Sequence, residues 1–430
     1  MKAFMQKLSL AALLLLVILQ SFAQPLPRTT PEMVGFSSQR LQRIDTAVND
    51  FIKNDIMPGA VVLVARQGKI VHLKAYGMRD REAKLPMTEN TMFRIASMSK
   101  TITTAAALML LEEGKFLLDD PLSMYIPAFA APKVMVDHPS GEADSKLEEA
   151  RSPILIRHLL NHTSGIAYGL FAKPQLSALY EDAGISDGIS QTEGTLADWV
   201  EKIAKMPLSN HPGEAFEYGL NIDVLGRLIE IWSGMPLDQF LQKRIFQPLQ
   251  MTDTHFFLTE QQASRLAAMY EPNSKGGLLR FPEETHKRGQ GFISSSFPYK
   301  GPRTFFSGGG GLVSTAQDYA RFAQMLVNGG THNNIRLLSP RTVELMLSNQ
   351  IGNFPYPWVP GHRFGFGGYV NENAAELESV GTFGWSGYFS TYYWIDPKEK
   401  IVALLLTQVV PELPRVENQF KNLIYQAIIK

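Results

Sequence analysis

Residues Phe93–Gly114 read FRIASMSKTITTAAALMLLEEG, a polar turn followed by a long apolar run. Ser97 and Lys100 stand three residues apart where this run predicts the start of a helix, so they share one helix face, whereas Ser99 points elsewhere. A serine beside a lysine is the arrangement of a nucleophile and its base. The lysine can act as a base only when burial or a neighbouring cation lowers its pKa, and the apolar surroundings favour burial.

The pair by itself is also compatible with an ordinary core helix. In that interpretation the stretch is a capped amphipathic helix, and Lys100 lies in solvent. Ser-x-x-Lys occurs by chance about once in a few hundred residues, because both residue types are common. Partners elsewhere in the chain therefore have to decide between the two interpretations.

The composition is that of a globular protein without a charge bias. The chain has 430 residues, of which 45% are hydrophobic and 19% charged, and its 41 basic residues balance 41 acidic ones. This balance argues against nucleic acid or an acidic membrane surface as a partner. The chain has no cysteine, which excludes disulfides, thiolate chemistry and a cysteine-linked lipid anchor.

The first 23 residues have the pattern of a signal peptide. Lys2 and Lys7 form the positive region, Leu8–Leu19 the apolar core, and Ser21-Phe22-Ala23 a small-x-small cleavage site. The apolar run is short for a bilayer span, although an uncleaved anchor would have a similar pattern. We therefore predict an exported protein, periplasmic or secreted, without stable membrane insertion once the leader is removed.

Two hairpins and two terminal helices are predicted from the hydrophobic pattern. Residues 59–76 and 391–407 each contain two apolar runs separated by a polar turn, which is typical of an antiparallel hairpin. Apolar residues at helical spacing predict helices over 37–54 and 416–429. His72, on the second strand of the first hairpin, is expected on an exposed face.

The order of these elements predicts an α+β fold. Both hairpins join one antiparallel sheet flanked by the terminal helices, and the middle of the chain forms a mostly helical insertion. The α/β lobe would comprise about residues 30–95 and 305–430, and the helical lobe about residues 96–304. Ser97 would then lie where the two lobes meet, a common position for a cleft.

Two further motifs receive structural interpretations. His158 and His162 stand four residues apart, but no third ligand follows at a suitable spacing, so no metal site is predicted. The glycine run at 307–314 (SGGGGLVS) lacks the Lys-Ser/Thr ending of a P-loop. It predicts a sharp turn or a close approach to another segment rather than phosphate binding. No cofactor is expected.

Three motifs resemble, in order and spacing, those of serine β-lactamase-like proteins: Ser97-Met98-Ser99-Lys100, Tyr218, and Trp385-Ser386-Gly387. This family includes class C β-lactamases, D-alanyl-D-alanine carboxypeptidases and related carboxylesterases. Segments at 154–165, 223–230, 309–330 and 394–397 also resemble the family. The resemblance covers most of residues 30–430 and implies a β-lactamase/transpeptidase-like fold, with residues 24–430 as one serine hydrolase domain acting on a small acyl substrate.

The resemblance also implies a role for each matching residue. Ser97 is the nucleophile that becomes acylated, and Lys100 is its base or supports the base. Tyr218 passes a proton to the leaving group and activates the deacylating water, unless it only packs its ring at a helix start. The backbone N–H groups of Ser97 and Tyr388 form the oxyanion hole. The implied substrate-binding residues are Trp385, Ser386, Gly387 and Asn221.

The chain departs from the family pattern at two places. The second motif of β-lactamases is usually Tyr-x-Asn, but here Leu220 stands two residues after Tyr218, and Asn221 comes one place late. The third motif usually begins with Lys or His, where this chain has Trp385, which could also be a core aromatic. The cation that would hold a β-lactam or peptide carboxylate is thus missing. Trp-x-Gly resembles the esterase branch, which favours carboxylic esters or similar neutral substrates.

Three hypotheses follow from these motifs. The first is an exported serine esterase that acts through an acyl-enzyme. The second is a β-lactamase or D-alanyl-D-alanine peptidase, with Arg303 or another cation in place of the missing lysine. The third is a non-catalytic binding protein, against which the intact Ser97, Lys100 and Tyr218 argue. Hydrolysis and transfer of the acyl group to an alcohol or amine are both open.

Overall fold

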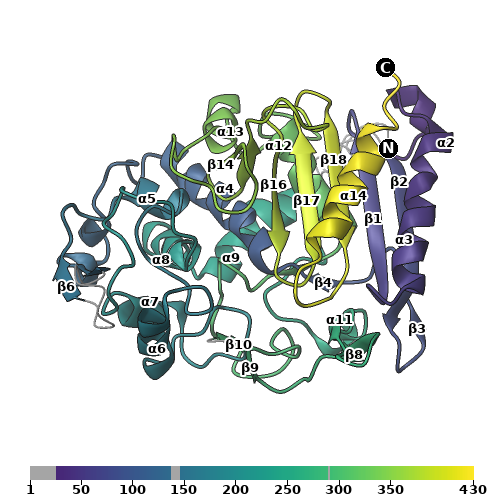
Figure 1. Ribbon diagram of the computed structural model, residues 1–430. Coiled ribbons are helices and arrows are strands. Elements are labelled where there is room, and N and C mark those ends of the chain that lie inside the picture. Colours follow the sequence, from purple (N-terminus) through teal and green to yellow (C-terminus); the bar gives the residue numbers. More distant parts are fainter. Residues whose placement is uncertain (1–25, 137–145, 289–290) are drawn as a thin grey trace, which may run out of the picture.

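The chain folds around one antiparallel sheet. A computed structural model describes residues 26–136, 146–288 and 291–430, and the predicted signal peptide, residues 1–23, lies outside these ranges. Within them, the main sheet has eight strands, numbered along the chain and arranged in a different order in space (Figure 1). From edge to edge they are β14 (His362–Phe364), β15 (Tyr369–Asn371), β16 (Phe383–Gly387), β17 (Thr391–Asp396), β18 (Ile401–Leu406), β1 (Gly59–Arg66), β2 (Lys69–Asp80) and β3 (Leu85–Pro86).

The first and last parts of the chain meet at the centre of this sheet. β1 pairs with β18, with Val61 opposite Leu406 and Arg66 opposite Ile401. The predicted hairpins are confirmed as β1–β2 and β17–β18, each an antiparallel pair. The helical middle of the chain is therefore inserted between two halves of one sheet, as the element order predicts.

Both faces of the sheet are buried, because alternate residues of each central strand face different layers. On β1, Val62 and Val64 pack in the cluster that includes helices α3 (Arg43–Lys53) and α14 (Pro414–Tyr425). Val61 and Leu63 pack in the cluster that includes α4 (Ser99–Glu112) and α12 (Ala316–Val327). The terminal helices thus cover one face, and α4 and α12 cover the other.

The remaining helices gather mainly on the side of α4, away from the terminal helices (Figure 1). The exception is α2 (Ser38–Leu41), which lies beside α3. The others are α5 (Ile156–Leu160), α6 (Pro174–Asp182), α7 (Leu196–Ile203), α8 (Asn221–Ser233), α9 (Leu237–Leu241), α10 (Gln247–Leu249), α11 (Glu260–Ala263) and α13 (Pro340–Met346). Short two-stranded ladders connect them: β4 (Phe93–Arg94) with β11 (Val313–Ser314), β5 (Lys133–Val136) with β6 (Lys146–Glu149), β7 (Tyr270–Pro272) with β8 (Leu278–Arg280), β9 (His286–Arg288) with β10 (Gly291–Ile293), and β12 (Thr331–His332) with β13 (Ile335–Arg336).

Helix α4 is a core helix rather than an amphipathic surface helix. Every residue from Ser99 to Leu110 is buried, since the sheet lies on one side of α4 and α8 on the other. Lys100 is therefore enclosed by protein, which excludes the interpretation of a lysine in solvent. None of the helices in the described part of the chain combines the length and the apolar character that crossing a bilayer requires.

The expected exposure of His72 is wrong. His72 pairs with Val64 across β1 and β2, which places it on the face that α3 covers. Its Nε2 lies 2.8 Å from the Tyr76 hydroxyl and 3.8 Å from a carboxylate oxygen of Asp45 on α3. Burial lowers the pKa of His72 to about 4, so the imidazole is neutral in this contact.

Candidate active site

The nucleophile candidate lies at a strained turn before a buried helix. Ser97 is in the middle of a short 3₁₀ turn, Ala96–Met98, that leads directly into α4. Ala96 has a φ of 41°, in the left-handed region that residues with a side chain rarely adopt. This turn brings the Ser97 side chain to the wall of a large cavity, whereas Ser99 is buried and accepts a hydrogen bond from the Leu312 N–H.

Three oxygen atoms surround the Lys100 amine. Its Nζ lies 2.7 Å from the Gly309 carbonyl, 2.8 Å from the Tyr168 hydroxyl and 3.1 Å from the Ser97 Oγ. The Gly309 carbonyl can only accept, but either hydroxyl can donate. A neutral amine can therefore give its two N–H groups to Gly309 and Tyr168 and accept the Ser97 proton with its lone pair. The contact set suits a lysine base.

Burial also prepares Lys100 for this role. Desolvation lowers the pKa of its amine to about 7, although Asp223 and then Asp187 favour the charged form. Both carboxyl groups are themselves buried, and burial raises the pKa of Asp187 to about 7. A substantial fraction of Lys100 is therefore neutral near pH 7, as a general base requires.

The glycine run contacts both Lys100 and Asp223. The Asp223 carboxylate accepts hydrogen bonds from the Ser307 hydroxyl at 2.6 Å and from the Gly309 N–H at 3.2 Å. A Cβ added to Gly309 would lie 2.4 Å from the same carboxylate, so only glycine fits this approach. The prediction that the run 307–314 approaches another segment closely is confirmed, and its Gly309 carbonyl contacts the lysine.

Tyr218 stands beside the same lysine. The Lys100 Nζ lies 4.8 Å from the centre of the Tyr218 ring, and Trp385 Nε1–H donates to the Tyr218 hydroxyl at 3.2 Å. Burial raises the pKa of Tyr218 above its usual range, although hydrogen bonds with Ser97 and Trp385 favour the phenolate. Tyr218 is therefore a phenol at neutral pH and a proton donor in the resting site, while Lys100 is the better base.

The strand β16 brings the third motif to the nucleophile. A Cβ on Gly387 would lie 2.3 Å from the Ile95 carbonyl, so the absence of a side chain lets β16 approach the turn that carries Ser97. Tyr388 follows directly and lines the same cavity. The proposed oxyanion donors, the Ser97 and Tyr388 N–H groups, thus belong to two segments in close contact.

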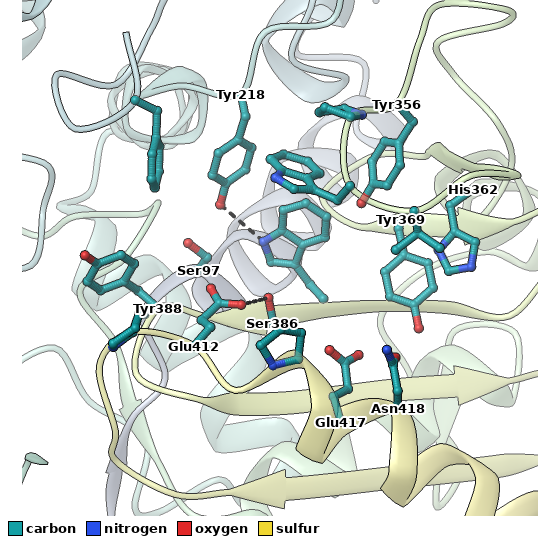
Figure 2. A pocket seen from close by; sticks show the side chains of 18 of the residues that line it. Ser97, Tyr218, Tyr356, His362, Tyr369, Ser386, Tyr388, Glu412, Glu417 and Asn418 are labelled. Atoms are coloured by element: carbon teal, nitrogen blue, oxygen red, sulfur yellow. Dashed lines mark hydrogen bonds between the residues drawn. The ribbon is translucent and has the colours of Figure 1, made fainter. Parts of the chain in front are cut away.

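The cavity beside Ser97 is large, aromatic and acidic. Its volume is about 1250 Å³, and Figure 2 shows Tyr218, Ser386, Tyr388 and Glu412 around Ser97 at one end. Among the described residues that line it, Lys421 is the only lysine and no arginine occurs. The carboxyl groups in its wall are those of Asp187, Glu217, Glu376, Glu378, Glu412 and Glu417. Arg303, the cation considered for a substrate carboxylate, does not line this cavity.

Asn221 does not line the cavity, so its predicted role in substrate binding is wrong. It is fully buried at the start of α8, where its side-chain amide contacts Ser164, lies 2.9 Å from His162 Nδ1 and donates to the Ile166 carbonyl at 3.3 Å. Leu220, at the position where the family has asparagine, is fully buried as well and does not line the cavity. The Asn221 side chain therefore points into the helical layer. The Lys100 amine instead contacts the Tyr168 hydroxyl.

Replacing Asn221 with alanine is expected to lower the free energy of unfolding by about 2–3 kcal/mol, because it leaves several buried polar groups unpaired. The kcat/KM of the folded enzyme should change by less than about threefold. Chemical denaturation and ester hydrolysis measure the two quantities. Asn49→Ala, on the exposed side of α3, is the control and should change stability by less than about 0.5 kcal/mol. A large loss of activity at unchanged stability would restore Asn221 as a substrate-binding residue.

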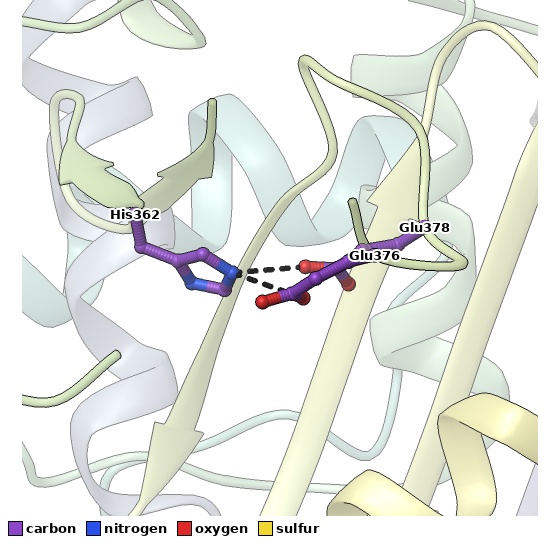
Figure 3. A group of neighbouring side chains, drawn as sticks. All are labelled: His362, Glu376 and Glu378. Atoms are coloured by element: carbon purple, nitrogen blue, oxygen red, sulfur yellow. Dashed lines mark hydrogen bonds and ion pairs between the residues drawn. The ribbon is translucent and has the colours of Figure 1, made fainter. Parts of the chain in front are cut away.

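One cluster of side chains in the described ranges has metal-ligand chemistry: His362, Glu376 and Glu378 (Figure 3). His362 lies at the far end of the cavity from Ser97 (Figure 2). His362 Nε2 lies 3.4 Å from a Glu376 oxygen and 3.2 Å from a Glu378 oxygen. The Lys421 Nζ lies 3.3 Å from a Glu378 oxygen. Burial alone would raise the pKa of Glu378, but His362 and Lys421 outweigh this effect and hold the pKa below its usual range. Glu378 is thus already engaged by the Lys421 ammonium and by the His362 imidazole, so the group is satisfied by side chains of this chain.

Several residues of the site escape prediction from the sequence. Asp223 and Gly309 lie in segments that resemble the family, but nothing local indicates that they flank a lysine. Tyr168, Asp187 and Glu412 lie in irregular loops, where no periodicity marks a buried or functional side chain. Only the fold brings these loops to the cavity.

Comparisons with known proteins agree with this geometry. A model of the beta-lactamase family matches residues 44–426. Esterase EstB of Burkholderia gladioli is 30% identical over 380 residues, which cover 86% of this chain and 91% of that protein. EstCE1, described as a hydrolase with promiscuous acyltransferase activity, has a TM-score of 0.79 and 32% identity, covering 90% of this chain and 99% of EstCE1. Simvastatin synthase (LovD) from Aspergillus terreus has a TM-score of 0.72 and 26% identity, covering 90% and 98%.

The family match spans nearly the whole described chain, and the similar structures extend over the sheet and the helical insertion alike. The predicted fold and family are therefore confirmed. The chain belongs to the beta-lactamase family and is a serine hydrolase related to esterases and acyltransferases.

Proposed function

We propose that this protein is a carboxylesterase that forms an acyl-enzyme on Ser97. The observation that carries the proposal is the contact of Ser97 with a buried lysine, Lys100, whose pKa is about 7, inside a cavity that offers no unpaired lysine or arginine among its described lining residues. The similarity to EstB and EstCE1 supports ester chemistry.

Acylation needs three proton transfers. Neutral Lys100 accepts the Ser97 proton as Oγ attacks the ester carbonyl, and the N–H groups of Ser97 and Tyr388 receive the resulting oxyanion. Collapse of the tetrahedral intermediate breaks the bond to the alkoxy group. Tyr218 gives its proton to that leaving oxygen and recovers one from the Lys100 ammonium, which restores the neutral amine.

Deacylation repeats these steps with a new nucleophile. Water, or an alcohol, gives its proton to the base and attacks the acyl carbon, and Ser97 leaves with a proton. The large cavity has room for an acyl group and an acceptor together, and the acyltransferase activity of EstCE1 supports transfer to alcohols as a second activity of the same acyl-enzyme.

β-Lactams and D-alanyl peptides are poorer candidates, because both carry a carboxylate. The aromatic side chain of Trp385 stands where the family usually has a cation, and its N–H is already donated to Tyr218. Lys421 lies 3.3 Å from Glu378 and 3.4 Å from Glu417, so its charge is already shared. A substrate carboxylate would enter a cavity with an excess of acidic groups.

We expect the purified protein to hydrolyse a short p-nitrophenyl ester with a kcat/KM about 100-fold or more above that for a chromogenic cephalosporin, since a charge-assisted contact of a few kcal/mol is lost. Initial rates over matched substrate ranges measure both constants. The ester substrate alone controls for loss of activity on purification. A cephalosporin that is turned over as well as the ester would disprove the substrate assignment and leave the acyl-enzyme intact.

We further propose that the protein is exported, on the basis of its leader. Lys2, Lys7, the apolar core Leu8–Leu19 and the Ser21-Phe22-Ala23 site together support cleavage after residue 23. Intact mass of the protein recovered from the periplasm or the medium checks this: a mature chain that begins at Gln24 agrees with it, and a full-length chain retained in the membrane contradicts it.

A further inference from the structure

The proposed mechanism leaves one acidic group beside the nucleophile without a role. Glu412, in the loop between β18 and α14, lines the same cavity as Ser97, and Figure 2 shows its carboxyl group pointing into that cavity. The Ser386 hydroxyl donates to the Glu412 carboxylate at 2.9 Å. Ser386 stands between Trp385 and Gly387 on β16, and the proposed oxyanion residue Tyr388 directly follows this strand.

This hydrogen bond removes the donor that a substrate carboxylate would need. A serine hydroxyl has a single O–H to donate, and here it is given to Glu412. The negative charge of Glu412 then stands where an anionic substrate group would have to lie, next to a donor that is already committed. The third motif of this chain therefore presents a carboxylate to the substrate instead of a cation.

Glu412 acts on the side of the cavity where the alcohol leaves. Ser386, which donates to Glu412, follows Trp385, whose N–H donates to the Tyr218 hydroxyl; in agreement with this placement, the negative charge of Glu412 raises the pKa of Tyr218, after the larger effect of burial. Tyr218 is the residue that protonates the leaving oxygen in the proposed mechanism. The charge of the leaving group, rather than that of the acyl group, is thus the property that Glu412 senses.

The neighbours of Glu412 do not neutralise it. Glu417 on α14 raises the pKa of Glu412, whereas Ser386 on β16 lowers it. The phenol groups of Tyr218 and Tyr392 face it as uncharged groups. Lys421 on α14, the one lysine among the described residues of the cavity wall, is instead engaged by Glu378 and Glu417.

Resting on the esterase function proposed above, we infer that Glu412, held by Ser386, is a charge selector. It favours esters whose alcohol part is neutral or carries a cationic group, and it rejects esters whose alcohol part carries a carboxylate. The aromatic rings of Trp385 and Trp358, 5.6 Å apart in the same wall, add a surface on which an ammonium group can bind.

The selection also depends on pH in a fixed direction. Burial raises the pKa of Glu412 to about 7, so the group is largely neutral below this pH and charged above it. Rejection of a carboxylate should therefore be strong at pH 8 and weak at pH 6. Lys100 protonates over the same range, but it acts on every ester alike and cancels when two esters are compared.

Three acetate esters test the inference: those of phenols with a para acetyl, a para carboxylate and a para trimethylammonium group. We compare wild type with Glu412→Gln, using kcat/KM relative to the neutral acetyl compound. The relative value for the carboxylate ester should rise about tenfold or more in Glu412→Gln, and that for the trimethylammonium ester should fall. Intrinsic differences between leaving groups cancel, because each ester is compared across two enzymes.

Glu344→Gln is the control, since it removes an exposed carboxylate that pairs with Arg341 on α13 and does not line the cavity. Its relative values should change by less than about threefold. If Glu412→Gln does not fold, the wild-type ratio of carboxylate to neutral ester between pH 6 and 8 replaces it, and this ratio should fall as pH rises.

The two proposals fail in different ways. Unchanged charge preference in Glu412→Gln, or a flat wild-type ratio across pH, overturns the selector while the neutral ester is still hydrolysed through Ser97. Failure to hydrolyse even the neutral ester in a Ser97-dependent manner overturns the esterase function itself.

Discussion

Ser97→Ala is expected to lower kcat/KM for a p-nitrophenyl ester by about 10⁴-fold or more, because it removes the only atom that can carry the acyl group. The cavity and the oxyanion donors would remain, so any residual activity reports binding and backbone N–H groups alone. The folded structure should be retained, since among the described residues the Ser97 hydroxyl has hydrogen-bond partners only in Lys100 and Tyr218. Steady-state kinetics and the far-UV circular dichroism spectrum check both statements.

Covalent labelling makes this prediction specific to one hydroxyl. A fluorophosphonate should add one phosphonyl group to the wild-type protein, located on Ser97 by peptide mass spectrometry, and none to Ser97→Ala. Ser99→Ala is the matched control: it removes a buried hydroxyl two residues away, which accepts from Leu312 N–H, and should keep the label while losing some stability. A label on another residue, or ester turnover by Ser97→Ala within tenfold of wild type, would refute the nucleophile.

Local sequence patterns predict the framework of this fold because its central elements are locally consistent. The strands β17 and β18 are nearly continuous apolar runs joined by a polar turn, and α14 repeats its buried residues at helical spacing. His72 shows the limit. Its strand alternates as a half-exposed strand should, but helix α3, from an earlier part of the chain, covers the face that this alternation predicts to be exposed to solvent.

The catalytic centre likewise has residues that the sequence predicts and residues that it does not. Ser97, Lys100, Tyr218 and Trp385 are recognisable from motifs, and the structure brings them into contact. The groups that set their chemistry come from loops, and no short-range pattern encodes where a loop will pack. Asn221 fails for a related reason: Leu220, at the motif position itself, is fully buried too, and only the fold shows that the start of α8 packs into the core and does not line the cavity.

Lys100→Met is expected to lower kcat/KM by about 10³-fold while leaving the protein folded, because methionine fills the space of the lysine stem but cannot accept a proton. The loss should appear in the rate of acylation, which a fluorophosphonate measures independently of deacylation. Lys100→Arg separates a base from a fixed charge: guanidinium stays protonated at any accessible pH, so this variant should be as inactive as Lys100→Met. Activity of Lys100→Arg within tenfold of wild type would show that the site needs only a cation.

If Lys100 is the base, the activity of the enzyme should decrease as the pH is lowered. Lys100 is a base only without its proton, and burial lowers its pKa to about 7, so kcat/KM for a neutral ester should fall as pH drops through this value. Asp187 and Glu412 also have pKa values of about 7, and two variants separate their contributions. Glu412→Gln should leave unchanged the pH at which kcat/KM falls to half its maximum. Asp187→Asn removes a negative charge that favours the Lys100 ammonium, so kcat/KM should fall at a lower pH than in the wild type. A shift to higher pH would contradict Lys100 as the titrating base.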